Sequence, residues 1–176
     1  GPVARLAAGR VAAFYRPVCP EYIVVSDQSG EVTVTSDAPV GHEAEARGAL
    51  EEAKAALADY APRYGPYPYT ERDVVATSTT ALGIEYPGII AITLRLYDPS
   101  ANFGGTPVTI MREATVAHEV GHQWFYNLVG DDQLDEPWLD ESLTQYITWR
   151  YYAHQYGAGG DPGFRASLDG RQKPAA

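Results

Sequence analysis

The sequence places two histidines four residues apart, with a glutamate directly after the first: His118, Glu119 and His122. Residues four apart on an α-helix lie one turn above each other on the same face, so both imidazoles would point at a common spot. Neutral imidazoles at this separation suit Zn²⁺, which binds histidine nitrogens at ~2.1 Å. Glu119 lies about 100° around the helix from His118. It is therefore placed to reach a water molecule beside the metal rather than the metal itself.

A catalytic zinc site needs a third protein ligand and an open fourth position. Glu141 is the candidate, because it follows His122 after eighteen intervening residues, early in a second expected helix. An antiparallel return of that helix would bring the carboxylate to the two imidazoles. The alternative is that both histidines only satisfy hydrogen bonds inside a helical core. In a chain of 176 residues with four histidines, the five-residue pattern arises by chance in roughly 0.6% of cases, which argues for the metal site.

These residues resemble the zinc site of aminopeptidase N-like metallopeptidases, a branch of the gluzincins. The shared features are His-Glu-x-x-His, eighteen residues, and a glutamate inside a Trp-Leu-Asp-Glu-Ser run at 138–142. Upstream, the run Leu-Gly-Ile-Glu-Tyr-Pro-Gly at 82–88 is similar to the family's Gly-x-Met-Glu-Asn segment, in the bacterial form that continues Tyr-Pro-Gly. The run Gly-Pro-Tyr-Pro-Tyr at 65–69 is similar to the family's Phe-Gly-x-Tyr-Pro stretch. Four positions depart from the family's usual residues: Leu82, Ile84, Asp140 and Ser142.

The resemblance implies an α+β, thermolysin-like catalytic domain, with a β-rich upper lobe followed by a helical lobe that carries the metal site. It implies one Zn²⁺ per chain, bound by His118, His122 and Glu141. Zinc lowers the pKa of water toward ~7, and Glu119 would take the proton as general base. Glu85 would bind the free α-ammonium of a peptide, so the enzyme would remove amino-terminal residues.

Two other hypotheses stay open. A gluzincin endopeptidase would share the zinc site, and Glu85 would then be a solvated turn acid. A catalytically silent domain with an intact zinc site is the third hypothesis, because the oxyanion-stabilising tyrosine of the resembled family lies far downstream of the third ligand and only 35 residues follow Glu141. Gln145 stands where thermolysin-type endopeptidases carry an aspartate, which favours the aminopeptidase.

The composition is that of an ordinary globular protein, with 45% apolar and 20% charged residues. The net charge of −10 argues against a nucleic-acid partner, which would need a basic patch. No run approaches the roughly 18 apolar residues of a membrane-spanning helix, and no signal segment opens the chain, so the compartment stays unknown. Cys19 is the only cysteine, which excludes an internal disulfide.

Hydrophobic periodicity predicts the elements that must position the candidate residues. Strands are expected at 10–16, 22–26, 31–35, 73–77 and 88–94, the second and third forming a hairpin. Apolar residues at three-to-four spacing predict a helix over 43–60, which Pro62 and the Gly-Pro-Tyr-Pro-Tyr run at 65–69 should end. Glu85 would directly precede the last strand.

The second half is expected to be helical. One helix should begin with a Thr106 cap followed by Pro107 and run to about Val129, with Gly130 as its left-handed closing residue. Another should begin after the Asp135 cap, with Pro137 in its first turn, and run to Tyr156, ended by Gly157. Beyond it, 159–163 should be loop and 164–168 a short turn.

These elements predict a single catalytic-domain fragment over 1–176, with a β-rich lobe at about 1–103 and a helical zinc-binding lobe at about 104–176. The flanking domains usual in the resembled family do not fit in this length. Apolar surface left exposed by their absence would favour self-association.

Overall fold

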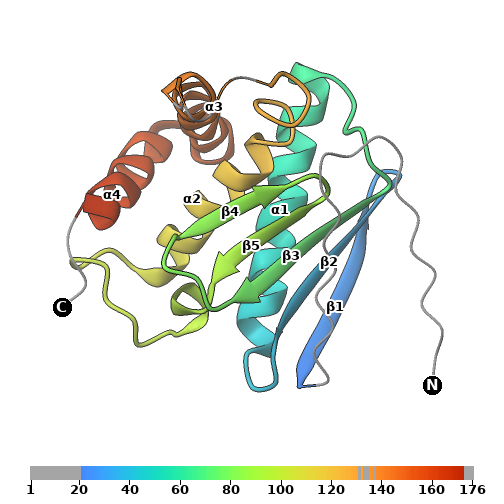
Figure 1. Ribbon diagram of the computed structural model, residues 1–176. Helices are drawn as coiled ribbons and strands as arrows, with labels where there is room; N and C mark the ends of the chain where they lie inside the picture. Colours follow the sequence, from blue (N-terminus) through green and yellow to red (C-terminus); the bar gives the residue numbers. More distant parts are fainter. Residues whose placement is uncertain (1–20, 131, 133–134, 137, 173–176) are drawn as a thin grey trace, which may run out of the picture.

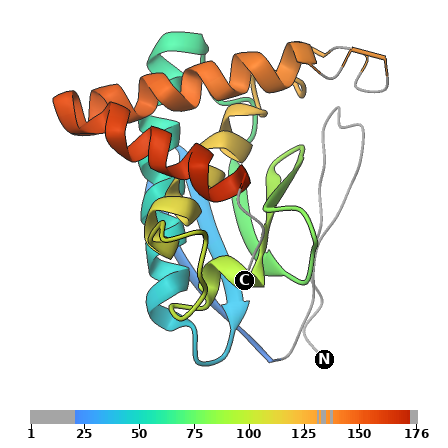
Figure 2. The same cartoon turned by 90° about the vertical axis from the view of Figure 1, so that its left-hand side faces the viewer.

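The structure, a computed structural model, describes residues 21–130, 132, 135, 136 and 138–172. The strand expected at 10–16 lies outside the described residues. The first part of the described chain forms a mixed five-stranded sheet, with one helix between its second and third strands, and the second part is helical. The helices cover one face of the sheet (Figures 1 and 2). The expected α+β architecture is thereby confirmed.

The predicted hairpin is confirmed, and both of its strands are longer than expected. Strand β1 (Tyr22–Ser29) pairs antiparallel with β2 (Val32–Pro39), from Tyr22 opposite Pro39 to Ser29 opposite Val32. Gly30 in the connecting turn has a φ of 62°, which glycine adopts without steric cost.

Helix α1 (Glu43–Tyr64) packs an alanine-rich stripe against the sheet. Its buried residues follow the three-to-four spacing seen in the sequence: Ala46, Ala49, Leu50, Ala53, Ala56, Leu57 and Tyr60. The helix runs four residues past the expected end at Tyr60, with Pro62 inside it, and it stops directly before the run at 65–69 that was expected to help end it. The chain leaves it at Gly65, which has a φ of 104° and whose amide still donates to the Ala61 carbonyl (3.2 Å).

The remaining strands are β3 (Glu71–Thr77), β4 (Gly83–Tyr86) and β5 (Ile89–Thr93). The sheet order is β1-β2-β3-β5-β4, with β2, β3 and β5 parallel and β4 antiparallel at the edge. Glu85 precedes β5, as expected, but it also lies within β4, a strand that the sequence did not predict. This strand has only four residues, and Pro87 with Gly88 (φ 79°) turns it directly into β5.

After the 3-10 turn η1 (Leu94–Tyr97), helix α2 (Val108–Gly121) crosses behind β4 and β5. The expected hydroxyl cap is not formed: Pro107 occupies the cap position, and the Thr106 hydroxyl donates to the Ala166 carbonyl instead (3.0 Å).

The prediction that this helix runs to about Val129 was wrong: the helix ends at Gly121, and the residues after it are held by local turn hydrogen bonds and by one bond to the end of α1. The Asn127 amide donates to the His122 carbonyl (3.0 Å), and the Trp124 indole donates to the Gly65 carbonyl (2.9 Å). The residue with a positive φ is Tyr126 (114°), not Gly130.

Helix α3 (Trp138–Tyr156) ends at Gly157, as predicted. The expected proline start falls on Pro137, which lies outside the described residues. The expected loop at 159–163 was wrong: the 3-10 turn η2 (Gly157–Gly159) leads straight into helix α4 (Gly160–Gln172). A Cβ at Gly160 would collide with the Tyr152 carbonyl, so this close α3–α4 approach requires glycine.

The hydrophobic core lies between the sheet and helices α1 and α2, and α3 and α4 close it at one end. Within the described part of the chain, no helix combines the length and apolar character that crossing a bilayer requires.

Candidate metal centre

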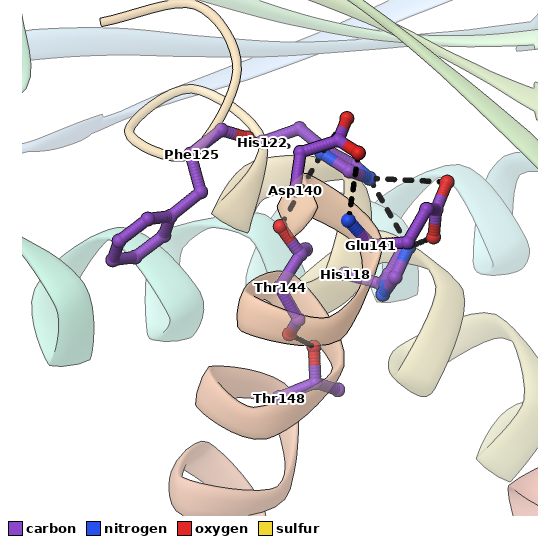
Figure 3. A network of polar contacts seen from close by, with 7 residues as sticks. All are labelled: His118, His122, Phe125, Asp140, Glu141, Thr144 and Thr148. Atoms are coloured by element: carbon purple, nitrogen blue, oxygen red, sulfur yellow. Dashed lines mark hydrogen bonds and ion pairs between the residues drawn. The ribbon is translucent and has the colours of Figure 1, made fainter. Parts of the chain in front are cut away.

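Two imidazoles meet at the C-terminal end of α2. His118 lies in the last helical turn and His122 is the residue that ends it, so one turn of helix separates them as the spacing predicted. Both are almost fully buried, at 4% and 1% exposure. Their Nε2 atoms lie 3.2 Å apart (Figure 3).

Helix α3 supplies the third donor from its first turn. One carboxylate oxygen of Glu141, Oε2, lies 3.1 Å from Nε2 of His118, and the other, Oε1, lies 3.8 Å from Nε2 of His122. All three side chains offer donor atoms within 4.8 Å of one another. Because the Glu141 side chain is 58% exposed, the group is open to solvent on one side.

The donor set fits zinc in both chemistry and spacing. Two imidazole nitrogens and a carboxylate oxygen match the ligands of catalytic zinc sites. Tetrahedral ligands at ~2.1 Å from a metal stand about 3.4 Å from one another. The separations of 3.1, 3.2 and 3.8 Å lie around that value.

The close crossing of α2 and α3 brings the third donor to the other two. Gly121 lies at the crossing, where a Cβ would stand 2.8 Å from Cδ1 of Ile147 and 2.9 Å from Cγ2 of Thr144. Both distances are shorter than van der Waals contact. The glycine inside the histidine motif therefore allows the helices to approach.

The second ring nitrogen of His122 is held by the turn that follows α2. Its Nδ1 donates to the Phe125 carbonyl (3.1 Å), with the Thr144 hydroxyl at 3.3 Å and the buried Asp140 carboxylate at 3.8 Å (Figure 3). A carbonyl only accepts, so the hydrogen stands on Nδ1 and the Nε2 lone pair of the neutral ring is free for a metal. No pattern of residue types predicts the contact with the Phe125 carbonyl, because backbone contacts leave no mark on residue type.

Glu119 directly follows His118 in α2 and is buried, but it does not belong to the donor group. Its side chain lies against Gly83 of β4, where a Cβ would stand 2.5 Å from its Cγ and Cδ. Its backbone carbonyl accepts a long hydrogen bond (3.5 Å) from the buried guanidinium of Arg72.

Glu85 reaches the same region from the sheet. It is half-buried on the edge strand β4, opposite Ile90 of β5. With His122 and Asp140 it forms a second group whose nitrogen and oxygen atoms lie within 4.8 Å of one another. The structure thus gathers all five sequence-predicted residues around the end of α2.

Comparison with known proteins covers the part of the chain that builds this site. Residues 48–168 match the peptidase family M1 domain. The chain is 31% identical over 135 residues to a probable aminopeptidase 2 of Sulfurisphaera tokodaii, covering 75% of this chain and 17% of that protein. It is 31% identical over 87 residues to aminopeptidase N of Canis lupus familiaris, covering 48% and 9%. It is 32% identical over 101 residues to endoplasmic reticulum aminopeptidase 2 of Homo sapiens, covering 54% and 10%.

The chain spans between 9% and 17% of the length of these relatives. The match nevertheless includes β3 to β5, the whole of α2 and α3, and therefore every residue of the candidate metal centre. The chain belongs to peptidase family M1, a family of metallo-aminopeptidases.

Proposed function

We propose that this chain is the catalytic part of a zinc aminopeptidase, which removes amino-terminal residues from peptides. The observation that carries the proposal is that His118, His122 and Glu141 offer ligand atoms within 4.8 Å of one another, with the carboxylates of Glu85 and Asp140 equally close to His122. Membership of family M1 supports the reaction class.

His118, His122 and Glu141 would hold the metal. When bound there, Zn²⁺ supplies Lewis-acid chemistry: it lowers the pKa of water toward ~7 and stabilises negative charge on the scissile carbonyl oxygen. The hydrogen bond from Nδ1 of His122 to the Phe125 carbonyl keeps the ring in the orientation and tautomer that metal binding needs.

Glu119 would act as the general base. It leaves the helix about 100° away from His118, so it is free of metal binding and can accept a proton from a water molecule in the site. Its burial against Gly83 limits the rotamers that the carboxylate can adopt. A base held in one place transfers protons more efficiently than a mobile one.

Glu85 would recognise the substrate's amino end. Strand β4 is the outermost strand on its side of the sheet, and an extended peptide can pair with such an edge by adding a strand. A carboxylate on that edge close to His122 would bind the peptide's α-ammonium. The first peptide bond of the substrate would then lie at the metal.

Substitution of Glu119 tests the reaction mechanism. Glu119→Gln keeps the shape of the side chain but removes the base, so zinc content should be unchanged while turnover of an aminoacyl-anilide falls at least about 10²-fold. Glu113→Gln is the matched control on the same helix, since Glu113 contacts Tyr151 and Tyr156 rather than the metal centre. Full turnover in a clean Glu119→Gln preparation would refute the assignment.

Substitution of Glu85 separates the aminopeptidase from an endopeptidase. Glu85→Ala should abolish the preference for peptides with a free amino end over acetylated ones. An unchanged preference would favour the endopeptidase, and a wild-type chain that binds zinc without hydrolysing either peptide would favour a silent domain.

A further inference from the structure

The amide of Gln123 is buried between the metal centre and the edge of the sheet. Gln123 directly follows His122, outside α2, and is 0% exposed. Its side chain reaches the turn between β4 and β5. A buried amide is retained only where both of its ends find partners.

Both ends of this amide bond to the β4–β5 turn. The Oε1 atom accepts a hydrogen bond from the Gly88 amide (2.9 Å), and Nε2 donates to the Tyr86 carbonyl (3.1 Å). These two backbone groups flank Pro87, so one side chain holds both sides of the turn. The geometry is well within hydrogen-bond range at each end.

The turn determines where Glu85 lies. Glu85 is the residue before Tyr86, and β4 has only four residues paired on one side with β5. So short an edge strand has few bonds of its own to define its position. The Gln123 amide ties it to the residue that follows His122, and hence ties the Glu85 carboxylate to the metal donors.

We infer that Gln123 is a positioning residue for the recognition of amino termini: it sets the separation between Glu85 and the metal centre. This inference rests on the role of Glu85 in the proposed function. The separation between Glu85 and the metal would determine that a single residue is removed from the amino end of the substrate.

Ligand pairs that differ only by the amine test the inference without requiring turnover. Leucine hydroxamate and the same hydroxamate lacking the α-amino group both bind zinc through the hydroxamate, and titration calorimetry on the zinc-loaded chain gives both affinities. The wild type should bind the amine-bearing compound at least about tenfold more tightly, as expected of a charge-assisted hydrogen bond.

Three variants of matched size separate positioning from general stability. Gln123→Met fills the same space without either hydrogen bond and should reduce the amine preference to about onefold, with zinc affinity within about threefold of wild type. Gln123→Glu retains the acceptor for Gly88 but not the donor for Tyr86, and should give an intermediate preference. Gln155→Met on the exposed end of α3 is the control and should keep the full preference.

The outcomes distinguish the inference from the proposed function. A wild-type chain with equal affinity for both hydroxamates would refute the role of Glu85 itself. A wild-type preference that survives in Gln123→Met would overturn the positioning role alone. A parallel loss of zinc affinity and amine preference in both Gln123 variants would also overturn it, because Gln123 would then support the whole site.

Discussion

The carboxylate side chain of Glu119 lies directly on the backbone of Gly83, in a space that any other residue at 83 would fill. A Cβ at that position would stand 2.5 Å from both Cγ and Cδ of Glu119. The proposed general base on α2 is therefore packed against the same edge strand that carries Glu85. The two carboxylates with proposed roles are linked through β4.

Replacing Gly83 should displace Glu119. Gly83→Ala forces the Glu119 side chain to rotate or β4 to shift, at a cost of about 1–3 kcal/mol in the free energy of unfolding. We expect kcat to fall at least about tenfold, since the base moves from its working place, while zinc affinity stays within about threefold. Gly159→Ala is the control, because nothing lies within 4 Å of that position. Unchanged kcat in Gly83→Ala would show that the contact has no catalytic consequence.

Replacing Gly121 should separate the metal donors by forcing α2 and α3 apart. Gly121→Ala creates contacts of 2.8 and 2.9 Å with Ile147 and Thr144. We expect the free energy of unfolding to fall by about 1–3 kcal/mol. Zinc binding should also weaken, because Glu141 lies on α3. Ile147→Val removes the atom in the closer contact. The double variant should therefore recover part of both losses, measured by urea unfolding and chelator competition. Strictly additive effects would contradict a steric origin.

Two buried arginines should respond oppositely to removal of their charge. Arg112 makes three hydrogen bonds of 2.9–3.1 Å to the Glu52 carboxylate. Arg72 is 0% exposed, and two of its guanidinium nitrogens have no hydrogen-bond partner among the described residues. Burial lowers the pKa of Arg72, against the opposing effects of Tyr67, Asp73 and Glu119.

We expect Arg112→Met to destabilise the fold by about 3–5 kcal/mol, because it leaves Glu52 as a buried, unpaired carboxylate. Arg72→Met removes a buried charge for which desolvation outweighs the interactions with Tyr67, Asp73 and Glu119, so we expect it to stabilise the fold by about 1–3 kcal/mol. Urea unfolding of both variants decides this. A destabilised Arg72→Met would show that the bond to the Glu119 carbonyl outweighs the desolvation of the guanidinium.

Metal binding should raise the stability of the chain. A ligand that binds only the folded state stabilises it by about 2.7 kcal/mol at 100 times its Kd, and His118, His122 and Glu141 come together only in the fold. Zinc at that concentration should raise the unfolding midpoint of metal-free protein. Mg²⁺, which prefers oxygen ligands, should not. His122→Ala should remove the zinc effect, and a zinc effect that persists in this variant would locate the metal elsewhere.

Local patterns in the sequence were sufficient for the parts of the site that lie within one element. The one-turn separation of His118 and His122 follows from helical periodicity, and the end of α3 at Gly157 follows from the conformational freedom of glycine. The β1–β2 hairpin likewise follows from two extended runs around a short polar loop. Each of these features depends on residues close together in the chain, so residue type and spacing determine them.

Only the tertiary structure decided how those elements meet. Strand β4 exists because it pairs with β5, and the turn after α2 is tied to the end of α1 by the bond from the Trp124 indole to the Gly65 carbonyl. The two hydrogen bonds of the Gln123 amide to the β4–β5 turn join it to backbone groups 35 and 37 positions away in the sequence. Hydrogen bonds and packing between residues so far apart gain their free energy only after the chain has folded, and a local sequence pattern therefore carries no trace of them.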